Sequence, residues 1–452
     1  MNKVDNAELL RSARDTAKNT TGHQRINALF DVGSFSEIDC FARSGEGYTE
    51  AVAGYGTIEG CPAYAFAQNS DVDGGAMSSA QAAKIKKIYN LAVATGIPVI
   101  GIYDSIGGRL QEGADMLAAY GEILLGANNL SGVVPQISLI LGPCIGTSAM
   151  IAASADIIVM SDKGELTIDT NGEHGSAGEA AELGLCHIAA GNEQEAIASV
   201  RKLITLIPSN NLSGVPVLDI QGSTNSSVLQ NNSDVKSIIA AVCDESSFIE
   251  FSGKFGKSAV TGLSEIDGST VGIIALNGVL DADSCSKAAR FIRFCDAYSL
   301  PVVTFVGAEK FASLREASKL SSCYSEATTG KITVITGSAY GSVYIATAGR
   351  GANADYTFSW PDAVVSPLAP ETAAVFLWSD RLAGSANPVE ERKNLIEEYK
   401  VTQASPFTAA ANGFVEDIID PKDTRIRIIE VLQMISGKRV SRLPKKHSNI
   451  QI

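Results

Sequence analysis

Two glycine-containing turns are the parts of this sequence best suited to chemistry. The first reads Leu141-Gly-Pro-Cys-Ile-Gly-Thr-Ser-Ala149, and the second reads Thr336-Gly-Ser-Ala-Tyr-Gly-Ser-Val-Tyr344. In each, an apolar segment is expected to form a buried strand that ends at glycine, and a helix is expected to begin at Gly146 or Gly341. The first N–H groups of a helix have no partner inside it and lie at the positive end of its dipole. They could therefore stabilise an oxygen that becomes negative during a reaction.

A loop before the first turn could bring a further backbone donor. It reads Asp104-Ser-Ile-Gly-Gly-Arg-Leu-Gln-Glu-Gly113 and follows the apolar run Val99 to Tyr103. Glycines at such turns also occur for backbone geometry alone. Both interpretations stay open for either turn taken singly, and the presence of two matching turns strengthens the functional one.

Side chains of the common catalytic sets are missing. The only histidines are at positions 23, 174, 187 and 447, and there is no G-x-S-x-G, H-E-x-x-H or Walker motif. His187 is predicted to be structural. No two cysteines form a C-x-x-C pair, so no metal site is predicted. An enzyme built on this chain would rely on backbone donors and on a base brought by its cofactor.

Composition narrows the class of protein. The chain has 452 residues, 45% of them apolar, which is enough for two hydrophobic cores. A formal net charge of −14 argues against nucleic-acid binding. The polar N-terminus has no signal-peptide pattern, so the eight cysteines are expected to be free thiols in a reducing cytoplasm. The apolar stretch Ile137 to Met160 contains Gly142, Pro143 and Asp156, and is predicted to be strand, turn and helix rather than a membrane span.

An internal repeat of about two hundred residues indicates how the fold is organised. Four segments recur in the same order: Asp31–Glu37 with Asp244–Glu250, Gly56–Gly60 with Ser264–Gly268, Ile97–Ile100 with Leu300–Val303, and Gln136–Gly142 with Lys331–Gly337. Between the halves, residues 208–234 are rich in Ser, Asn and Gly, which is typical of a linker. We therefore predict an N-terminal domain over 1–207, a linker over 208–234 and a C-terminal domain over 235–452.

Each half alternates helix and strand. Residues 80–95 predict a helix with Ile85, Ile88, Tyr89, Ala92 and Val93 on one face, capped by Ser78 or Ser79 and ended by Gly96. A buried strand follows at Val99–Tyr103, and the second half repeats the pattern before a strand at Val302–Val306. Helix and buried strand in alternation predict an α/β fold.

With these turns, the sequence resembles the biotin-dependent acyl-CoA carboxyltransferase family from Arg25 to Ile452. That family includes propionyl-CoA carboxylase β subunits, methylmalonyl-CoA carboxyltransferases and the α subunits of sodium-pumping acyl-CoA decarboxylases. The resemblance is carried by Asp104–Gly113, Gly132–Cys144, Lys287–Ala297, Ala339–Tyr344 and the tail Gly437–Ile450. It implies two tandem domains of the ClpP/crotonase superfamily that arose by internal duplication.

The resemblance also implies roles for residues of the first domain. The family holds the thioester oxygen of an acyl-CoA there as an enolate, in an oxyanion hole of backbone donors. The matching catalytic positions are Gly108 and the Gly146-Thr147 turn, with Gly107 as a substrate-binding neighbour. The family's usual Gly-Gly is Gly146-Thr147 here, a change that keeps the backbone donor and narrows the pocket.

In the second domain the family holds the ureido oxygen of biotin. The matching catalytic positions are Ser342 and Val343, where Gly-Ala is usual, with a loop donor near Lys310-Phe311. Lys310 replaces a glycine of the family loop. Ile345 matches a position that shapes the acyl pocket and is commonly polar, so an altered acyl preference is expected.

The family's chemistry would explain the missing side chains. Carboxybiotin releases CO₂, its ureido nitrogen takes the α-proton of the acyl-CoA, and the enolate attacks CO₂. The expected substrates are of the methylmalonyl/propionyl-CoA or malonyl/acetyl-CoA type, in either direction.

Partners follow from what the sequence lacks. There is no A-M-K-M-like biotinylation site and no ATP-grasp loop. The resemblance therefore implies biotin on a separate biotin carboxyl carrier protein, together with a biotin carboxylase or membrane decarboxylase subunits. It also implies a dimer-based homo-oligomer such as a hexamer, in the cytoplasm or held peripherally at the membrane by its partners.

Two alternatives are kept. The chain could be a non-catalytic scaffold subunit of a biotin-dependent complex, an idea motivated by Thr147, Ser342 and Lys310. It could also be a crotonase-type hydratase or isomerase, although no carboxylate pair near the turns supports that.

Overall fold

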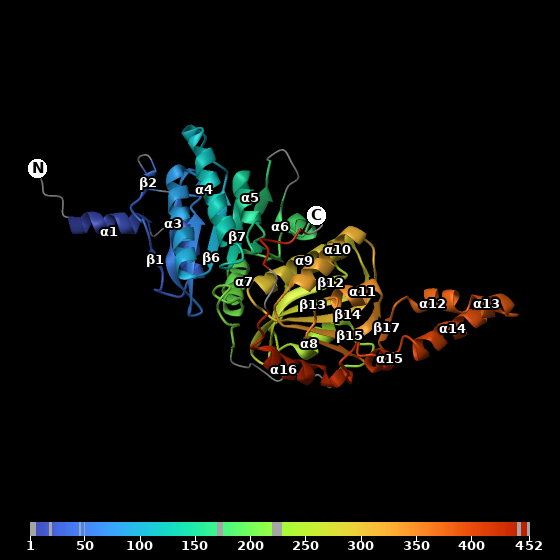
Figure 1. The fold of residues 1–452 in the computed structure, drawn as a ribbon. Helices are drawn as coiled ribbons and strands as arrows, with labels where there is room; N and C mark the ends of the chain where they lie inside the picture. Colours follow the sequence, from blue (N-terminus) through green and yellow to red (C-terminus); the bar gives the residue numbers. More distant parts are fainter. Residues whose placement is uncertain are drawn as a thin grey trace, which may run out of the picture. The chain divides into compact units, whose positions relative to one another are not determined.

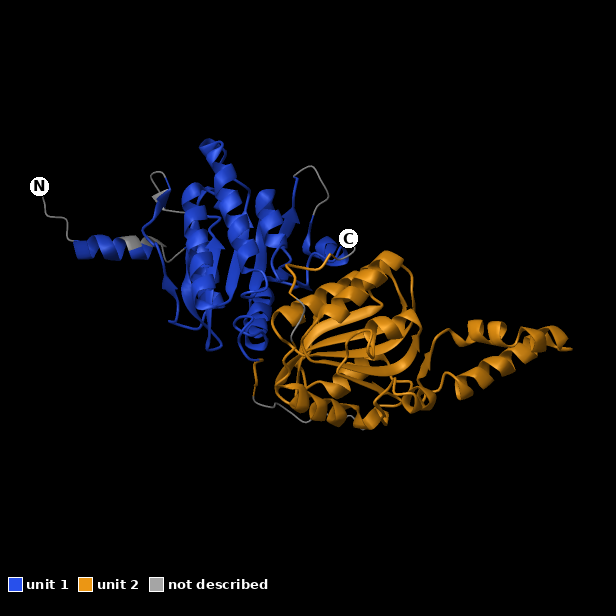
Figure 2. Ribbon diagram, viewed as in Figure 1, with its two compact units in different colours: residues 1–214 blue, residues 215–452 orange. Residues whose placement is uncertain are grey.

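Each half of the chain builds one large sheet of mostly parallel strands, flanked by helices (Figure 1). The structure, a computed structural model, describes residues 6–17, 20–44, 47–48, 50–169, 175–218, 228–440 and 444–449. The chain divides into two compact units, residues 1–214 and 215–452, which we call unit 1 and unit 2 (Figure 2). The division falls within the predicted linker, of which residues 219–227 lie outside the described residues.

In unit 1 the strand order is β1-β4-β5-β6-β7-β8-β10, and the short strand β9 pairs with the end of β7. The pairs β1–β4 and β4–β5 are antiparallel, and the other pairs of the sheet are parallel. The strands are β1 (Ser36–Glu37), β4 (Ala51–Ile58), β5 (Cys61–Gln68), β6 (Val99–Ser105), β7 (Gln136–Ile145), β8 (Ile157–Met160), β9 (Glu165–Thr167) and β10 (Ile188–Ala189), with a separate hairpin of β2 (Arg43–Ser44) and β3 (Gly47–Tyr48).

Unit 2 repeats this order as β11-β12-β13-β14-β15-β16-β18, and here β17 pairs with the end of β15. The strands are β11 (Ile249–Phe251), β12 (Ala259–Ile266), β13 (Ser269–Leu280), β14 (Val302–Phe311), β15 (Lys331–Tyr340), β16 (Tyr356–Ser359), β17 (Val364–Ser366) and β18 (Asp417–Ile418). The two matching topologies agree with an internal duplication.

Helices connect the strands. In unit 1 they are α1 (Asn6–Ala17), α2 (Thr21–Leu29), η1 (Asp73–Gly75), α3 (Ser79–Thr95), η2 (Leu110–Glu112), α4 (Asp115–Leu130), α5 (Thr147–Ala153), α6 (Ala177–Glu182) and α7 (Glu193–Leu206). In unit 2 they are α8 (Val235–Val242), α9 (Ala282–Ala297), α10 (Leu314–Glu326), α11 (Ser342–Thr347), α12 (Pro370–Leu377), α13 (Ser379–Gly384), α14 (Pro388–Thr402), α15 (Pro406–Ala411), η4 (Pro421–Asp423) and α16 (Thr424–Ile435). Helices α12 to α14 extend away from the sheet of unit 2 (Figure 1).

Local sequence explains the helix that leads into the first candidate site. The Ser78 hydroxyl accepts from the Gln81 N–H at the start of α3, and Gly96 ends the helix in the left-handed conformation. The expected apolar face is buried except for Val93, which is 47% exposed. The expectation for Val93 was wrong because it lies one position round the helix from Ala92, beyond the stripe that meets the sheet. Strand β6 follows and is buried throughout.

The apolar stretch Ile137 to Met160 forms most of β7, then α5 and β8, as expected for a buried strand, turn and helix. No helix in the described part of the chain is long and apolar enough to cross a membrane. All eight cysteines are free thiols; six are buried, and Cys40 and Cys61 are half-buried.

Candidate active site

The first turn joins β7 to α5 through Gly146, which has φ 68° and ψ −133°. This is a conformation that glycine adopts readily and other residues rarely do. The Gly146 N–H donates to the Thr167 carbonyl at 2.8 Å, at the end of β9. Gly146 therefore sets the direction of the chain, and its own N–H is already engaged. In the described structure the next N–H, that of Thr147, has no acceptor, and the Thr147 side chain is exposed.

The loop after β6 presents a second unengaged amide. Met77 N–H donates to Gly107 O, and Arg109 N–H donates to Met77 O, each at 2.8 Å. Amides alternate in direction along an extended chain, so the Gly108 N–H between these bonds faces away from Met77. No described group accepts from it. The neighbouring Gly107 N–H, by contrast, donates to Ser105 Oγ at 3.2 Å.

Sheet pairing and one tyrosine bring the turn and the loop together. Ser105 at the end of β6 is in register with Cys144 near the end of β7, so both segments leave the same edge of the sheet. A Cβ atom on Gly108 would lie 3.3 Å from Tyr120 Cε2. The Ser148 hydroxyl, in the first turn of α5, donates to the Tyr120 hydroxyl at 3.3 Å. Burial raises the pKa of Tyr120, so this hydroxyl stays protonated at neutral pH.

A buried charge cluster fixes the end of β6. Asp104 Oδ2 accepts from Arg25 Nη1 at 2.5 Å and from the Ser70 hydroxyl at 2.8 Å. Arg25 also donates to Glu193, with Nη2 to Oε2 at 3.0 Å. Through these bonds Asp104 holds the end of β6 in place.

A second charge cluster fixes the loop that carries Gly108. The Arg109 guanidinium donates to the carboxylates of Glu50 and Asp73 and to the Ser44 hydroxyl. Glu50 is fully buried and also accepts from the Ser78 hydroxyl at 2.6 Å. The loop therefore has a rigid base, which preorganises the Gly108 amide.

Unit 2 contains the same turn. Gly341, between β15 and α11, has φ 42°, and its N–H donates to Ser366 O at 2.8 Å at the end of β17. A Cβ atom there would lie 2.6 Å from Pro367 O, so glycine is required. The N–H of the next residue, Ser342, has no acceptor within the described residues. Its side chain is exposed, whereas that of Val343 is fully buried.

In unit 2 the backbone pairing distinguishes one amide of the Lys310-Phe311 loop from its neighbours. Leu280 is in register with Phe311, and Ala312 N–H donates to Leu280 O at 2.8 Å. This repeats the bonding of Met77 around Gly108, so the Phe311 N–H faces away from Leu280. Lys310 precedes it with an exposed side chain, and Ile345 lies on α11 with 58% of its surface exposed.

The structure thus groups the predicted residues by unit: Gly107, Gly108, Gly146 and Thr147 in unit 1, and Lys310, Phe311, Ser342, Val343 and Ile345 in unit 2. His187 has a structural contact, since the Ile158 N–H donates to its Nδ1 at 2.9 Å. Sequence reasoning missed Tyr120 and Ser148, because nothing in their local pattern distinguishes them from ordinary helix residues.

Two copies of a strand–turn–helix site, built from backbone amides on duplicated α/β units, define a protein of the crotonase-like class. The chain belongs to the carboxyl transferase domain family, which it matches over residues 14–450. The family and the fold class expected from the sequence are thereby confirmed.

Named relatives support the same class of enzyme. The chain is 37% identical to methylmalonyl-CoA decarboxylase subunit alpha of Veillonella parvula, over 96% of this chain and 93% of that protein. It is 35% identical to the propionyl-CoA carboxylase carboxyltransferase subunit of Haloferax mediterranei, with the same coverage. Among solved structures it is similar to transcarboxylase 12S, described as a hexamer with hydrolysed methylmalonyl-coenzyme A bound. That match has a TM-score of 0.93 and 31% identity, and it covers 99% of this chain and 98% of that one.

Proposed function

We propose that this chain is a catalytic carboxyltransferase subunit that moves a carboxyl group between biotin on a carrier protein and an acyl-CoA. The observation that carries the proposal is an arrangement that occurs in both units. In unit 1 the Gly108 and Thr147 amides have no acceptor among the described residues. In unit 2 the Ser342 amide has none, and the Phe311 amide faces away from Leu280. Membership of the carboxyl transferase domain family supports it. The relatives suggest an acyl-CoA of the methylmalonyl/propionyl type, and the malonyl/acetyl type is kept as a further candidate.

In unit 1 the Gly108 and Thr147 N–H groups would hold the thioester oxygen of the acyl-CoA. Removal of the α-proton places negative charge on that oxygen, and two preorganised donors stabilise it without the cost of reorienting water. Gly146 supplies the turn, and Gly107 shapes the loop. Tyr120 lies against Gly108 and accepts a hydrogen bond from Ser148 of α5, so the two side chains connect the loop to the helix.

In unit 2 the Phe311 and Ser342 N–H groups would hold the ureido oxygen of biotin. Val343, which is fully buried, would fix the turn by packing into the core. When bound, biotin supplies the transferable carboxyl group and a ureido nitrogen that can accept the α-proton. The residues present fit this group, because they offer backbone N–H groups, and Lys310, which precedes Phe311 in the chain, has an exposed side chain. We assign Ile345, which is exposed on α11 together with Ser342, to the part of the pocket that contacts the acyl group.

The division of labour extends to the predicted domains and partners. We propose that residues 1–207 bind the acyl-CoA and that residues 235–452 bind biotin. A carrier protein would deliver the biotin, and a biotin carboxylase or membrane decarboxylase subunits would complete the complex. The hexamer described for transcarboxylase 12S supports a dimer-based oligomer for this chain as well.

A decarboxylation assay tests the proposal against the scaffold alternative. Purified protein is mixed with methylmalonyl-CoA or malonyl-CoA, and loss of the carboxylate is followed with free biotin or the cognate carrier as acceptor. We expect biotin-dependent turnover. No turnover by folded protein with its own carrier, across a panel that includes glutaconyl-CoA, would favour the scaffold instead.

Thr147→Pro makes the assay specific for the backbone donor. Proline lacks an N–H but suits the first position of a helix, so α5 should still form. Loss of one oxyanion donor is expected to lower kcat by about 10²–10³-fold. Thr147→Ala keeps the N–H and should retain activity close to that of the wild type, so equal losses in the two variants would contradict the assignment.

A further inference from the structure

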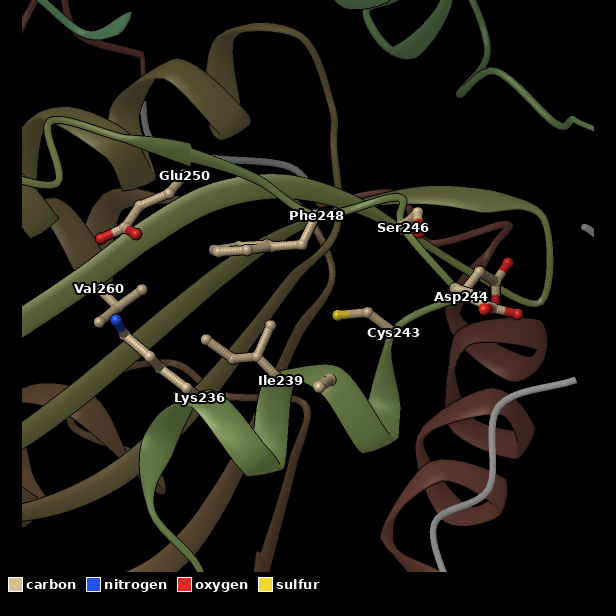
Figure 3. Close-up of a pocket in the computed structure, with 10 residues that line it drawn as sticks. Lys236, Ile239, Cys243, Asp244, Ser246, Phe248, Glu250 and Val260 are labelled. Atoms are coloured by element: carbon tan, nitrogen blue, oxygen red, sulfur yellow. The ribbon is translucent and has the colours of Figure 1, made fainter. Parts of the chain in front are cut away.

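A cavity of about 590 Å³ lies in unit 2, between helix α8 and the strands β11 and β12 (Figure 3). Apolar side chains form much of its lining, among them Ile239, Ala240, Phe248 and Val260. Cys243 directs its sulfur into the space under the Phe248 ring in this view. The residues of the candidate active site do not line this cavity.

The duplication shows what occupies the equivalent place in unit 1. The repeat that aligns Asp31–Glu37 with Asp244–Glu250 places Phe30 opposite Cys243 and Phe35 opposite Phe248. In unit 1 the Phe30 and Phe35 rings stack with centroids 5.3 Å apart and an interplanar angle of 27°. Phe30 is 2% exposed, so the position is a buried aromatic site.

The surrounding frame is the same in both units. A Cβ atom on Gly54 would lie 2.7 Å from Phe35 Cε2, and one on Gly262 would lie 2.6 Å from Phe248 Cε2. Phe35 in unit 1 and Phe248 in unit 2 therefore pack against a strand glycine in the same way.

The arginine that anchors the end of α2 in unit 1 has a counterpart at the end of α8 in unit 2. Arg201 donates to Leu29 O and to Asp31, and Arg425 donates to Val242 O and to Asp244. The backbone beside the cavity is therefore held in the same way in both units, whereas the side chain at position 243 differs.

One change opens the site in unit 2: cysteine stands at position 243, where unit 1 has the Phe30 ring. Ser264, at the position of Gly56, is the larger residue of that pair, and its hydroxyl lies 2.7 Å from Ser247 Oγ. In unit 1 the edge is closed by the contact of His23 Nε2 with Glu37 Oε2 at 3.1 Å. The equivalent residues are Lys236 and Glu250, and in the described structure no ion pair joins them.

We propose that this cavity is a binding site for a small molecule with a phenyl-sized aromatic ring. The ring would stack on Phe248 as Phe30 stacks on Phe35, and polar substituents would reach Lys236 or Glu250 at the edge. Stacked rings in this geometry attract one another beyond the area they bury. This proposal does not rest on the proposed carboxyl transfer, because its test measures binding to the cavity and not catalysis.

Titration of the full-length protein with 4-fluorobenzyl alcohol, followed by ¹⁹F NMR, tests the proposal. We expect saturable binding to the wild type. Ala240→Phe, at an exposed position on α8 that lines the cavity, should weaken binding at least about tenfold by occupying it. Asn27→Phe is the matched control: it is the equivalent exposed position on α2, where Phe30 already fills the space, and it should leave the affinity unchanged.

A second variant restores the side chains of unit 1. Cys243→Phe combined with Ser264→Gly recreates the Phe30 and Gly56 pair, and it should abolish binding while keeping the fold. Absence of saturable binding to the wild type would overturn the proposal. So would unchanged affinity in folded Ala240→Phe protein, because that variant does not depend on repacking the core.

Discussion

The Cα atom of Gly142 lies against the carboxylate of Asp104: a Cβ atom added to Gly142 would stand 2.2 Å from Asp104 Oδ1. The two residues belong to the neighbouring strands β7 and β6, just before the turn and the loop of the candidate site. Asp104 cannot move aside freely, because its other oxygen is held by Arg25 at 2.5 Å. The contact therefore couples β7, which leads to Thr147, to β6, which leads to Gly108.

Gly142→Ala should break this coupling. The added methyl group must displace either β7 or the buried Asp104–Arg25 pair, and overpacking of this kind costs about 1–3 kcal/mol. We expect a lower free energy of unfolding in denaturant titrations and a lower kcat. Gly121→Ala is the control, since Gly121 is exposed in α4 with nothing within 4 Å of an added Cβ atom, and it should not destabilise the protein. A Gly142→Ala variant as stable and active as the wild type would refute the coupling.

Ser342→Pro tests the donor of unit 2. It removes the N–H that follows Gly341, at a helix position where proline is tolerated. Biotin-dependent turnover should fall by about 10²-fold or more, whereas the dissociation constant for acyl-CoA, measured by calorimetry, should not change. Ser342→Ala retains the amide and should remain active. Weaker acyl-CoA binding with unchanged turnover would instead assign this turn to the other substrate.

Arg109→Ala should be strongly destabilising. Glu50 is fully buried, and the substitution would leave its carboxylate without the guanidinium; removing one partner of a buried ion pair costs about 3–5 kcal/mol. The midpoint of denaturant unfolding measures this loss.

The double variant Arg109→Ala with Glu50→Gln should recover part of the stability lost in Arg109→Ala, because it removes the uncompensated charge. Simple additivity of the two single changes would show that the ion pair is not the source of the effect.

The fold and the two turns could be predicted because their signals are local. Strands such as Gln136–Ile145 are continuous apolar runs, and the glycines that end them recur at matching points of a repeated sequence. Backbone amides do the proposed chemistry, so a turn pattern was enough to locate them.

The parts that could not be predicted depend on contacts between residues far apart in the chain. Arg25 and Asp104 are 79 residues apart, and Arg109 and Glu50 are 59 apart. The engagement of the Gly146 N–H by Thr167 requires a short strand to return beside β7, which no local pattern announces. For that reason the sequence could not separate the turn-forming role of Gly146 from the donor role of Thr147.

Asp31, the first residue of the repeated segment Asp31–Glu37, should make the stability of the protein depend on pH, because folding lowers the pKa of its carboxyl group. The Gly60 N–H, which donates to Oδ2 at 2.9 Å, is the main cause that lowers its pKa from the usual 3.8 to about 2. The Glu59 N–H, the Thr57 hydroxyl and the Arg201 guanidinium add to the effect.

A carboxyl group with a lowered folded-state pKa contributes its full stabilisation above the unfolded-state pKa of 3.8, and the contribution is lost as pH falls to about 2. Asp31→Asn keeps an oxygen acceptor but not the charge. We expect it to be less stable than the wild type at pH 7, with the difference in unfolding free energy shrinking between pH 3.8 and about 2. A difference that stays constant over that range would mean that the amides bind the Asp31 oxygens no more tightly when the group is ionised.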